Sequence, residues 1–211
     1  MDYRQIAITT VILLLFAITG TAMVAFTWDN THDRIAANER ATLLRKLNQL
    51  IPAERYDNAL LEDRIDVINS KFLGTRDPVA VYRARKTGKP VALVMSPVAP
   101  DGYNGSIKLL VGINHDGSLA GVRVVTHRET PGLGDAIDEQ RSDWVFGFDG
   151  KSLGNPAVDK WGVRKDHGDF DQLTGATITP RAIVKAVKQA LLYYRAHHDT
   201  LFASGINTDE S

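Results

Sequence analysis

The sequence contains no cysteine, so it can form no disulfide, no cysteine-bound zinc site and no cysteine-bound iron–sulfur cluster. Its 25 Lys and Arg residues balance 25 Asp and Glu residues, which leaves no general attraction to nucleic acid. The six histidines show no H-x-x-x-H or H-E-x-x-H spacing, so no metal site is predicted. Dinucleotide and P-loop glycine fingerprints are absent, as is any Ser/His/Asp signature. The length of 211 residues is enough for one domain of ordinary size plus a tail or an anchor.

The anchor is an uncharged apolar run over residues 6–28, IAITTVILLLFAITGTAMVAFTW. At about 1.5 Å per residue a helix of this length measures about 34 Å, enough to cross a hydrocarbon core of about 30 Å. The alternative is a cleaved signal peptide, for which TGTA at 19–22 offers small residues. Such peptides usually have a shorter apolar region, of about 7–15 residues. The sequence predicts an uncleaved single-pass transmembrane helix.

The charges that flank this run leave its orientation open. Arg4 precedes the run, while Arg34, Arg40, Arg45 and Lys46 follow it. This balance does not favour an outward-facing domain, but long domains translocate largely regardless of such charges.

The rest of the chain predicts an α+β fold. Alternating apolar residues around KTGK and around NHDGS predict two hairpins and hence an antiparallel sheet. A helix is expected over 33–51, ended by Pro52, and another from Pro180 to about His198. The second helix has its apolar face at Ile183, Val187, Ala190, Leu191 and Tyr194. The predicted organisation is an N-terminal stub at 1–5, a transmembrane helix at 6–28, a helical linker region at 29–78, a folded domain at 79–199 and a flexible tail at 200–211.

The stretch DQLTGATITP, residues 171–180, concentrates three threonines ahead of the last helix. Thr179 is expected to be the N-cap, with Pro180 at the first helical position. Capping does not explain Thr174-Gly175-Ala176-Thr177, in which Gly175 can adopt a positive φ and the small Ala176 permits close approach of another group. A helix N-terminus favours an anion. These residues by themselves leave two interpretations open, a capped turn and a phosphate site that contains a hydroxyl.

Three stretches of the chain resemble a known family, and the last of them contains the DQLTGAT motif. DQLTGAT resembles the flavinylation motif D-x-x-[ST]-G-A-[ST], in which a transferase esterifies FMN to the last hydroxyl. HRETPGLGDAI at 127–137, DWVFGF at 143–148 and KWGVRKDHGDFDQLTGATITPRAIVKAV at 160–187 resemble the G subunit of the Rnf ion-translocating electron transport complex, also called Rsx. The chain is more distantly similar to the C subunit of the sodium-pumping NADH:quinone reductase. The resemblance covers nearly the whole chain, including the anchor.

This resemblance implies a covalent FMN-binding domain at 79–199, with FMN joined through its phosphate to Thr177. It implies further FMN contacts at Glu129, Thr130, Leu133, Gly134, Thr174, Gly175 and Ala176, with Asp171 as the first residue of the flavinylation motif. The function implied is that of an electron carrier within an ion-translocating oxidoreductase, with little catalysis by the isolated protein. The complex would move electrons between a low-potential donor such as ferredoxin and NAD, or keep a redox-sensing transcription factor reduced.

The partners implied are other integral-membrane and peripheral subunits, a flavin transferase and the membrane, with no nucleic acid. The domain would lie on the periplasmic side of the bacterial inner membrane. Two rival functions stay open, an anchored phosphate- or flavin-binding assembly module without covalent flavin and a free-standing anchored flavin reductase.

Several of these residues also have structural interpretations. Glu129 and Thr130 can form a polar loop before Pro131, and Leu133 can belong to the core. Trp144 and Trp161 can stack on a flavin, but large aromatic residues are more often core residues. His127 is expected to be a hydrogen-bonded structural histidine.

Overall fold

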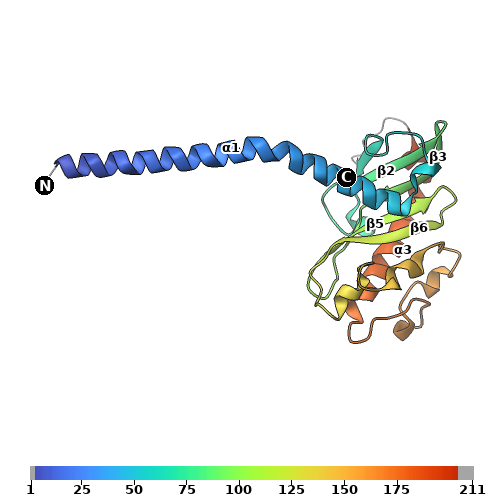
Figure 1. Cartoon of the computed structure of the whole chain (residues 1–211). Helices are drawn as coiled ribbons and strands as arrows, with labels where there is room; N and C mark the ends of the chain where they lie inside the picture. Colours follow the sequence, from blue (N-terminus) through green and yellow to red (C-terminus); the bar gives the residue numbers. More distant parts are fainter. Residues whose placement is uncertain (1–2, 204–211) are drawn as a thin grey trace. The chain divides into compact units, whose positions relative to one another are not determined.

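The computed structural model describes residues 3–203 (Figure 1). The chain forms two compact units, one ending at Arg45 and the other beginning at Lys46, and each is described by itself.

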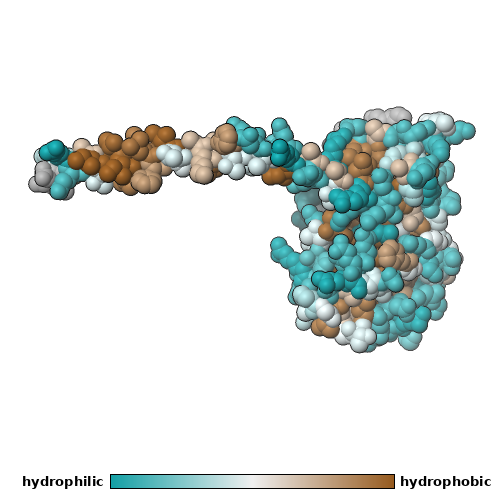
Figure 2. All heavy atoms as spheres, viewed as in Figure 1, coloured by the Kyte–Doolittle hydropathy of each residue, from teal (hydrophilic) through white to brown (hydrophobic). Residues whose placement is uncertain are grey.

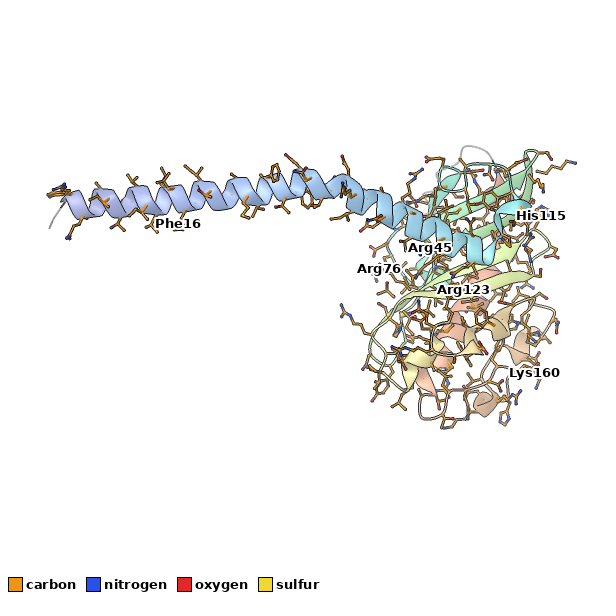
Figure 3. The ribbon with its side chains drawn as sticks, in the orientation of Figure 1. Phe16, Arg45, Arg76, His115, Arg123 and Lys160 are labelled. Atoms are coloured by element: carbon orange, nitrogen blue, oxygen red, sulfur yellow. The ribbon has the colours of Figure 1, made fainter. Side chains whose placement is uncertain are left out.

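The first unit is a single exposed helix, the greater part of α1 (Tyr3–Leu50). Its most apolar 18-residue window has a mean hydropathy of 2.2 and no buried residue, so by length and composition this stretch can span a membrane. The apolar run is the brown surface of the helix in Figure 2. Phe16 projects from it with 75% of its surface exposed (Figure 3).

The helix predicted at 33–51 is confirmed, but it is part of α1, which continues without interruption from the apolar run to Leu50. No Gly or Pro lies between the two stretches, and the side chains of Asn30 and Thr31 bond to the carbonyls of Phe26 and Thr27 one turn earlier. A change of composition alone does not end a helix. The predicted end of the helical pattern at Pro52 is confirmed.

The second unit contains a six-stranded antiparallel sheet. Its strands are β1 (Arg64–Val67), β2 (Val79–Lys86), β3 (Lys89–Met95), β4 (Val98–Ala99), β5 (Ile107–Asn114) and β6 (Leu119–Thr126). β1 pairs with β2 and β2 with β3, β3 and β4 pair with successive parts of β5, and β6 also pairs with β5 (Figure 1). Both predicted hairpins, β2–β3 and β5–β6, are confirmed. In the β2–β3 turn Thr87 and Gly88 both have positive φ, as a tight hairpin turn requires.

Helix α3 (Ile178–Phe202) contributes to the same hydrophobic core as the strands of the sheet. The five residues predicted for its apolar face are all buried, together with inward-facing residues of the strands such as Val81, Leu93 and Ile113. Short helices fill the connections: η1 (Ala53–Arg55), α2 (Ser70–Leu73), η2 (Gly134–Ile137), η3 (Asp143–Phe148), η4 (Val158–Lys160) and η5 (Arg164–Asp166). The α+β class with one candidate membrane helix is confirmed.

Two stretches outside the predicted 79–199 domain lie in this same unit. β1 pairs with β2, and Leu201 and Phe202 at the end of α3 are only 2% and 8% exposed. The predicted tail otherwise falls on residues 204–211, outside the described residues.

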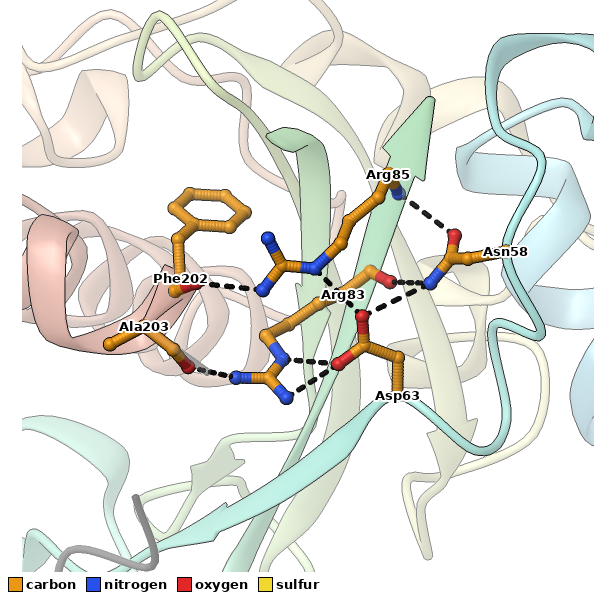
Figure 4. A network of polar contacts seen from close by, with 6 residues as sticks. All are labelled: Asn58, Asp63, Arg83, Arg85, Phe202 and Ala203. Atoms are coloured by element: carbon orange, nitrogen blue, oxygen red, sulfur yellow. Dashed lines mark hydrogen bonds and ion pairs between the residues drawn. The ribbon is translucent and has the colours of Figure 1, made fainter. Parts of the chain in front are cut away.

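The C-terminal end of α3 is closed by a polar network (Figure 4). Arg83 donates to the carbonyl of Ala203 at 2.6 Å and Arg85 to that of Phe202 at 2.7 Å. Both guanidinium groups also bond to the carboxylate of Asp63, at 2.6 and 2.8 Å. Cations at a helix C-terminus complement its partial negative charge. The network therefore joins the segment before β1, the strand β2 and the last turn of α3.

Candidate functional site

The stretch 130–133 folds into a tight turn beside the N-terminal end of α3. The carbonyl of Thr130 accepts hydrogen bonds from the amides of Leu133 at 3.2 Å and Gly134 at 3.1 Å. Pro131 fixes the second turn position, and Gly132 takes the third with φ of 77°. Pro followed by a positive-φ Gly is typical of a type II turn.

A second turn of the same kind covers Leu173–Ala176. The amide of Ala176 donates to the carbonyl of Leu173 at 3.1 Å, and Gly175 has φ of 78°, so the predicted positive φ is confirmed. A Cβ atom on Gly175 would lie 3.1 Å from Cδ2 of Leu133. The two turns therefore touch, although about forty residues separate them in sequence.

Between these turns lies a pocket of about 300 Å³. Its lining residues are Tyr103, Glu129, Thr130, Leu133, Gly134, Gly175, Ala176, Thr177, Ile178 and Thr179. The structure thus brings together seven of the residues predicted to contact FMN. Thr174 is exposed and does not line the pocket. Asp171 also lies outside it, where its carboxylate pairs with Arg164 at 3.0 Å.

The hydroxyl of Thr177 does not cap helix α3. Thr177 occupies the N-cap position of α3 with helical φ and ψ of −85° and −29°, and its side chain makes no capping hydrogen bond. Within the described residues, the amides of Thr177, Ile178 and Thr179 have no hydrogen-bond acceptor. A hydroxyl and three unsatisfied amides therefore meet at the edge of the pocket, where the helix carries its partial positive charge.

The prediction that Thr179 caps the helix is wrong. Thr179 is the second residue of α3, is only 1% exposed, and donates its hydroxyl hydrogen to Oε2 of Glu129. Pro180 is accordingly the third helical residue, not the first. Proline fits there because amides of the first turn have no intrahelical acceptor to lose.

Glu129 is a buried carboxylate, 4% exposed, held by hydrogen bonds instead of a cation. Besides Thr179, the backbone amide of Asn104 donates to its Oε1 at 3.1 Å. Asn104 also donates through its side chain to Oγ1 of Thr130 at 3.1 Å. No ion pair of Glu129 is found among residues 3–203. The loop at 102–104, the turn at 130–133 and the first turn of α3 are thereby tied together.

Gly134 leaves room for this carboxylate. A Cβ atom there would lie 3.0 Å from Oε2 of Glu129 and 3.2 Å from Oγ1 of Thr179. The backbone of Gly134 therefore lies close against the side chains of Glu129 and Thr179 in the pocket wall.

The other candidates lie as follows. Trp161 is a core residue, 5% exposed, and Trp144 packs against Phe148 and donates to the carbonyl of Asp171 at 2.7 Å. His127 accepts from the amide of Glu129 at 3.1 Å, as expected of a structural histidine. Leu133 is not a core residue, since 45% of its surface is exposed at the pocket.

Sequence reasoning missed Tyr103, Ile178 and Asn104. Tyr103 and Asn104 stand in a loop between β4 and β5, far from both turns in sequence, and only tertiary folding brings them to the pocket. Ile178 follows Thr177 directly but carries no polar group that would have drawn attention.

Comparison with known proteins matches two families, the RnfG N-terminal region over residues 1–50 and the FMN-binding domain over residues 102–192. The chain is 48% identical over 198 residues to the G subunit of the ion-translocating oxidoreductase complex of Shewanella oneidensis, which covers 94% of this chain and 93% of that one. It is 47% identical over 206 residues to the same protein of Shewanella loihica, with coverage of 98% and 97%. The chain belongs to the RnfG family.

The FMN-binding region of this RnfG family member begins at the 102–104 loop and contains every lining residue of the pocket. The residues present fit FMN. Three amides and a helix N-terminus suit a phosphate, and Leu133, Ala176 and Ile178 offer apolar surface to a ring system.

Proposed function

We propose that this chain is the FMN-carrying electron-transfer subunit of an ion-translocating oxidoreductase complex, with FMN esterified through its phosphate to Oγ of Thr177. The observation that carries the attachment site is the combination of a free hydroxyl and three unpaired amides, among the described residues, at the N-terminus of α3. A phosphodiester at this position keeps about one negative charge, which a helix N-terminus stabilises by about 0.3–1 kcal/mol.

The neighbouring threonines are poorer acceptors. Thr179 is buried and its hydroxyl is bonded to Glu129, so its modification would break a buried hydrogen bond to a carboxylate. Thr174 is exposed and does not line the pocket. Thr177 alone of the three combines an unengaged hydroxyl with a place in the pocket wall.

When bound, FMN supplies the redox chemistry, while the protein supplies position and electrostatics. We assign the remaining contacts to Glu129, Thr130, Leu133, Gly134, Gly175 and Ala176 in the pocket wall, with Thr174 shaping the turn. Glu129 holds the three segments of the wall in register through its bonds to Asn104 and Thr179. The side chain of Asp171, the first residue of the motif, lies outside the pocket and is 67% exposed, so the flavin transferase that the attachment requires can reach it.

The attachment is tested by the intact mass of the full-length chain, produced with and without a flavin transferase. We expect an added mass equal to FMN less one water, only in the presence of the transferase, and yellow colour that survives denaturation. An unchanged mass with flavin released on denaturation would favour the assembly module without covalent flavin. Isolation free of any other subunit, with full flavin reductase activity, would favour a free-standing enzyme.

Sidedness is part of the proposal. We place the domain on the periplasmic side of the inner membrane, joined to the bilayer by the apolar part of α1. Protease added to spheroplasts should remove the domain while α1 stays with the membrane. Complete protection in sealed spheroplasts would reverse the orientation.

A further inference from the structure

The negative charge of Glu129 is costly where it lies. Among the described residues that line the pocket, Glu129 is the only acidic or basic one. Its side chain is only 4% exposed, and in the part of the chain that the structure describes it forms no ion pair. Burying a carboxylate without a cation is unfavourable. A charge kept under these conditions points to a function of the charge itself.

The hydrogen bonds of Glu129 do not require a charge. Its Oε1 accepts from the amide of Asn104 at 3.1 Å, and its Oε2 accepts from the hydroxyl of Thr179. A glutamine at this position could keep both contacts, because its carbonyl oxygen accepts from Asn104 while its side-chain N–H donates to the hydroxyl oxygen of Thr179. Joining the three segments of the wall therefore needs a polar side chain of this length, but not a negative one.

The neighbouring positive charges do not neutralise the carboxylate. Arg128 precedes it in sequence but is exposed to water, which screens its charge, and no ion pair joins the two within residues 3–203. Arg181 and Lys185 of α3 each form an ion pair with an aspartate. The N-terminus of α3 contributes only about half an elementary charge. The pocket wall therefore keeps a net negative charge.

We propose that the carboxylate of Glu129 lowers the reduction potential of the flavin bound in this pocket and so makes that flavin a stronger electron donor. The proposal rests on the proposed function, because it takes the pocket as the FMN site. Reduction that takes up more electrons than protons leaves extra negative charge on a flavin. A fixed negative charge in the pocket wall opposes this gain, and the repulsion is strongest where water is excluded.

Two substitutions separate the charge of Glu129 from its shape. Glu129→Gln keeps the length of the side chain and removes its charge, whereas Glu129→Asp keeps the charge and shortens the side chain. Glu54→Gln is the matched control, the same substitution at an exposed glutamate of η1 that does not line the pocket. The reduction potential of the bound flavin is measured on the full-length chain in detergent, by titration with dithionite in the presence of a reference dye of known potential.

We expect Glu129→Gln to shift the equilibrium towards reduced flavin by about tenfold or more at a fixed state of the dye, which corresponds to about 30 mV for a two-electron couple. Glu129→Asp should stay close to the wild type, because it keeps the charge, and Glu54→Gln should not differ from it. The shift should persist at high salt, since buried charges are little screened.

An unchanged equilibrium in Glu129→Gln would overturn the proposal, and so would an equal shift in Glu54→Gln. A shift of the same size and sign in Glu129→Asp would also overturn it, because the fit of the side chain would then be responsible. Produced without the transferase, Glu129→Gln should unfold at no lower denaturant concentration than the wild type. A clear loss of stability there, or a folded Glu129→Gln protein that takes up no flavin, would show that the charge serves folding or attachment instead.

The two proposals fail separately. A wild-type chain without covalent flavin would contradict the attachment at Thr177, and the same comparison would then be made on reversibly bound FMN. A fully flavinylated series with one common potential would leave the attachment standing and contradict the role of Glu129. A chain that binds FMN in neither way would contradict both.

Discussion

The two ends of α3 differ in whether their backbone groups have hydrogen-bond partners. At the C-terminal end, carbonyls of the last turn are met by Arg83 and Arg85, which Asp63 holds in place. At the N-terminal end, three amides and the hydroxyl of Thr177 have no partner among the described residues. Unsatisfied backbone groups at a helix end are a cost unless something else binds them. We infer that the closed end serves stability and the open end serves a ligand.

Breaking the closed end should have the largest effect on folding. Asp63→Ala leaves two guanidinium groups, 9% and 15% exposed, without their shared carboxylate, at a cost of about 3–5 kcal/mol in the free energy of unfolding. Chemical denaturation measures this loss. Covalent flavin on the remaining folded protein should be unaffected.

The control for that variant is Asp66→Ala, which removes an exposed ion pair with Arg64 and should cost under about 1 kcal/mol. Equal losses in the two variants would contradict the structural role of the Asp63 network.

At the open end, Thr179→Val should cost about 1.5–3 kcal/mol, because Glu129 stays buried and loses a hydrogen bond to its charged oxygen. Thr179→Ser keeps the hydroxyl and should recover most of this stability. Covalent flavin should be retained in both, since neither variant touches Thr177. Loss of flavin from Thr179→Val, with Thr179→Ser still modified and stability unchanged in both, would point to Thr179 as the acceptor.

Gly134→Ala changes the shape of the pocket wall without removing any of its polar groups. The added methyl group would press on Glu129 at 3.0 Å and should cost about 1 kcal/mol or more. We also expect less complete flavinylation, because the wall beside the attachment site is displaced. Gly147→Ala is the control, since nothing lies within 4 Å of a Cβ atom there. Full flavinylation of Gly134→Ala at unchanged stability would show that the wall tolerates the methyl group.

The smallest effect belongs to the exposed pair of Asp166 with Arg181, which joins η5 to the first turns of α3. The guanidinium of Arg181 lowers the pKa of the Asp166 carboxyl from its usual 3.8. A lowered pKa in the folded state means that the stabilisation is present at neutral pH and is lost as the pH falls below 3.8 through the folded value. Asp166→Asn should therefore lower the unfolding midpoint slightly at pH 7 and not at all in strong acid. Asp159→Asn, at a carboxylate with no ion pair within residues 3–203, should show no such difference.

Local patterns predicted the fold better than they predicted its boundaries. The hairpins follow from alternation and from turn glycines that neighbours in sequence determine. β1 was not predicted because RIDV is too short and too charged to stand out, and its pairing with β2 is not local. The continuity of α1 was missed because the change from apolar to polar residues near Trp28 resembles the end of a helix. The backbone nevertheless stays helical across it.

In the site, too, local motifs could be predicted from the sequence and contacts between distant residues could not. Seven lining residues belong to two motifs that a family resemblance brings out, but no pattern could place Tyr103 beside them. The predicted N-cap failed for a specific reason. Proline is tolerated throughout the first helical turn, so Pro180 does not fix which residue precedes the helix. The decisive contact, between Thr179 and Glu129, joins residues fifty positions apart.

The account depends most on one atom, Oγ of Thr177, and mass spectrometry of a variant series coexpressed with a flavin transferase tests it most directly. Thr177→Ala should carry no covalent FMN while unfolding at nearly the wild-type denaturant concentration, since its side chain makes no capping bond to lose. Thr177→Ser should still be modified, and Thr174→Ala and Thr179→Ser should be modified as the wild type is. A flavin-bearing peptide recovered from the Thr177→Ala protein would contradict the account.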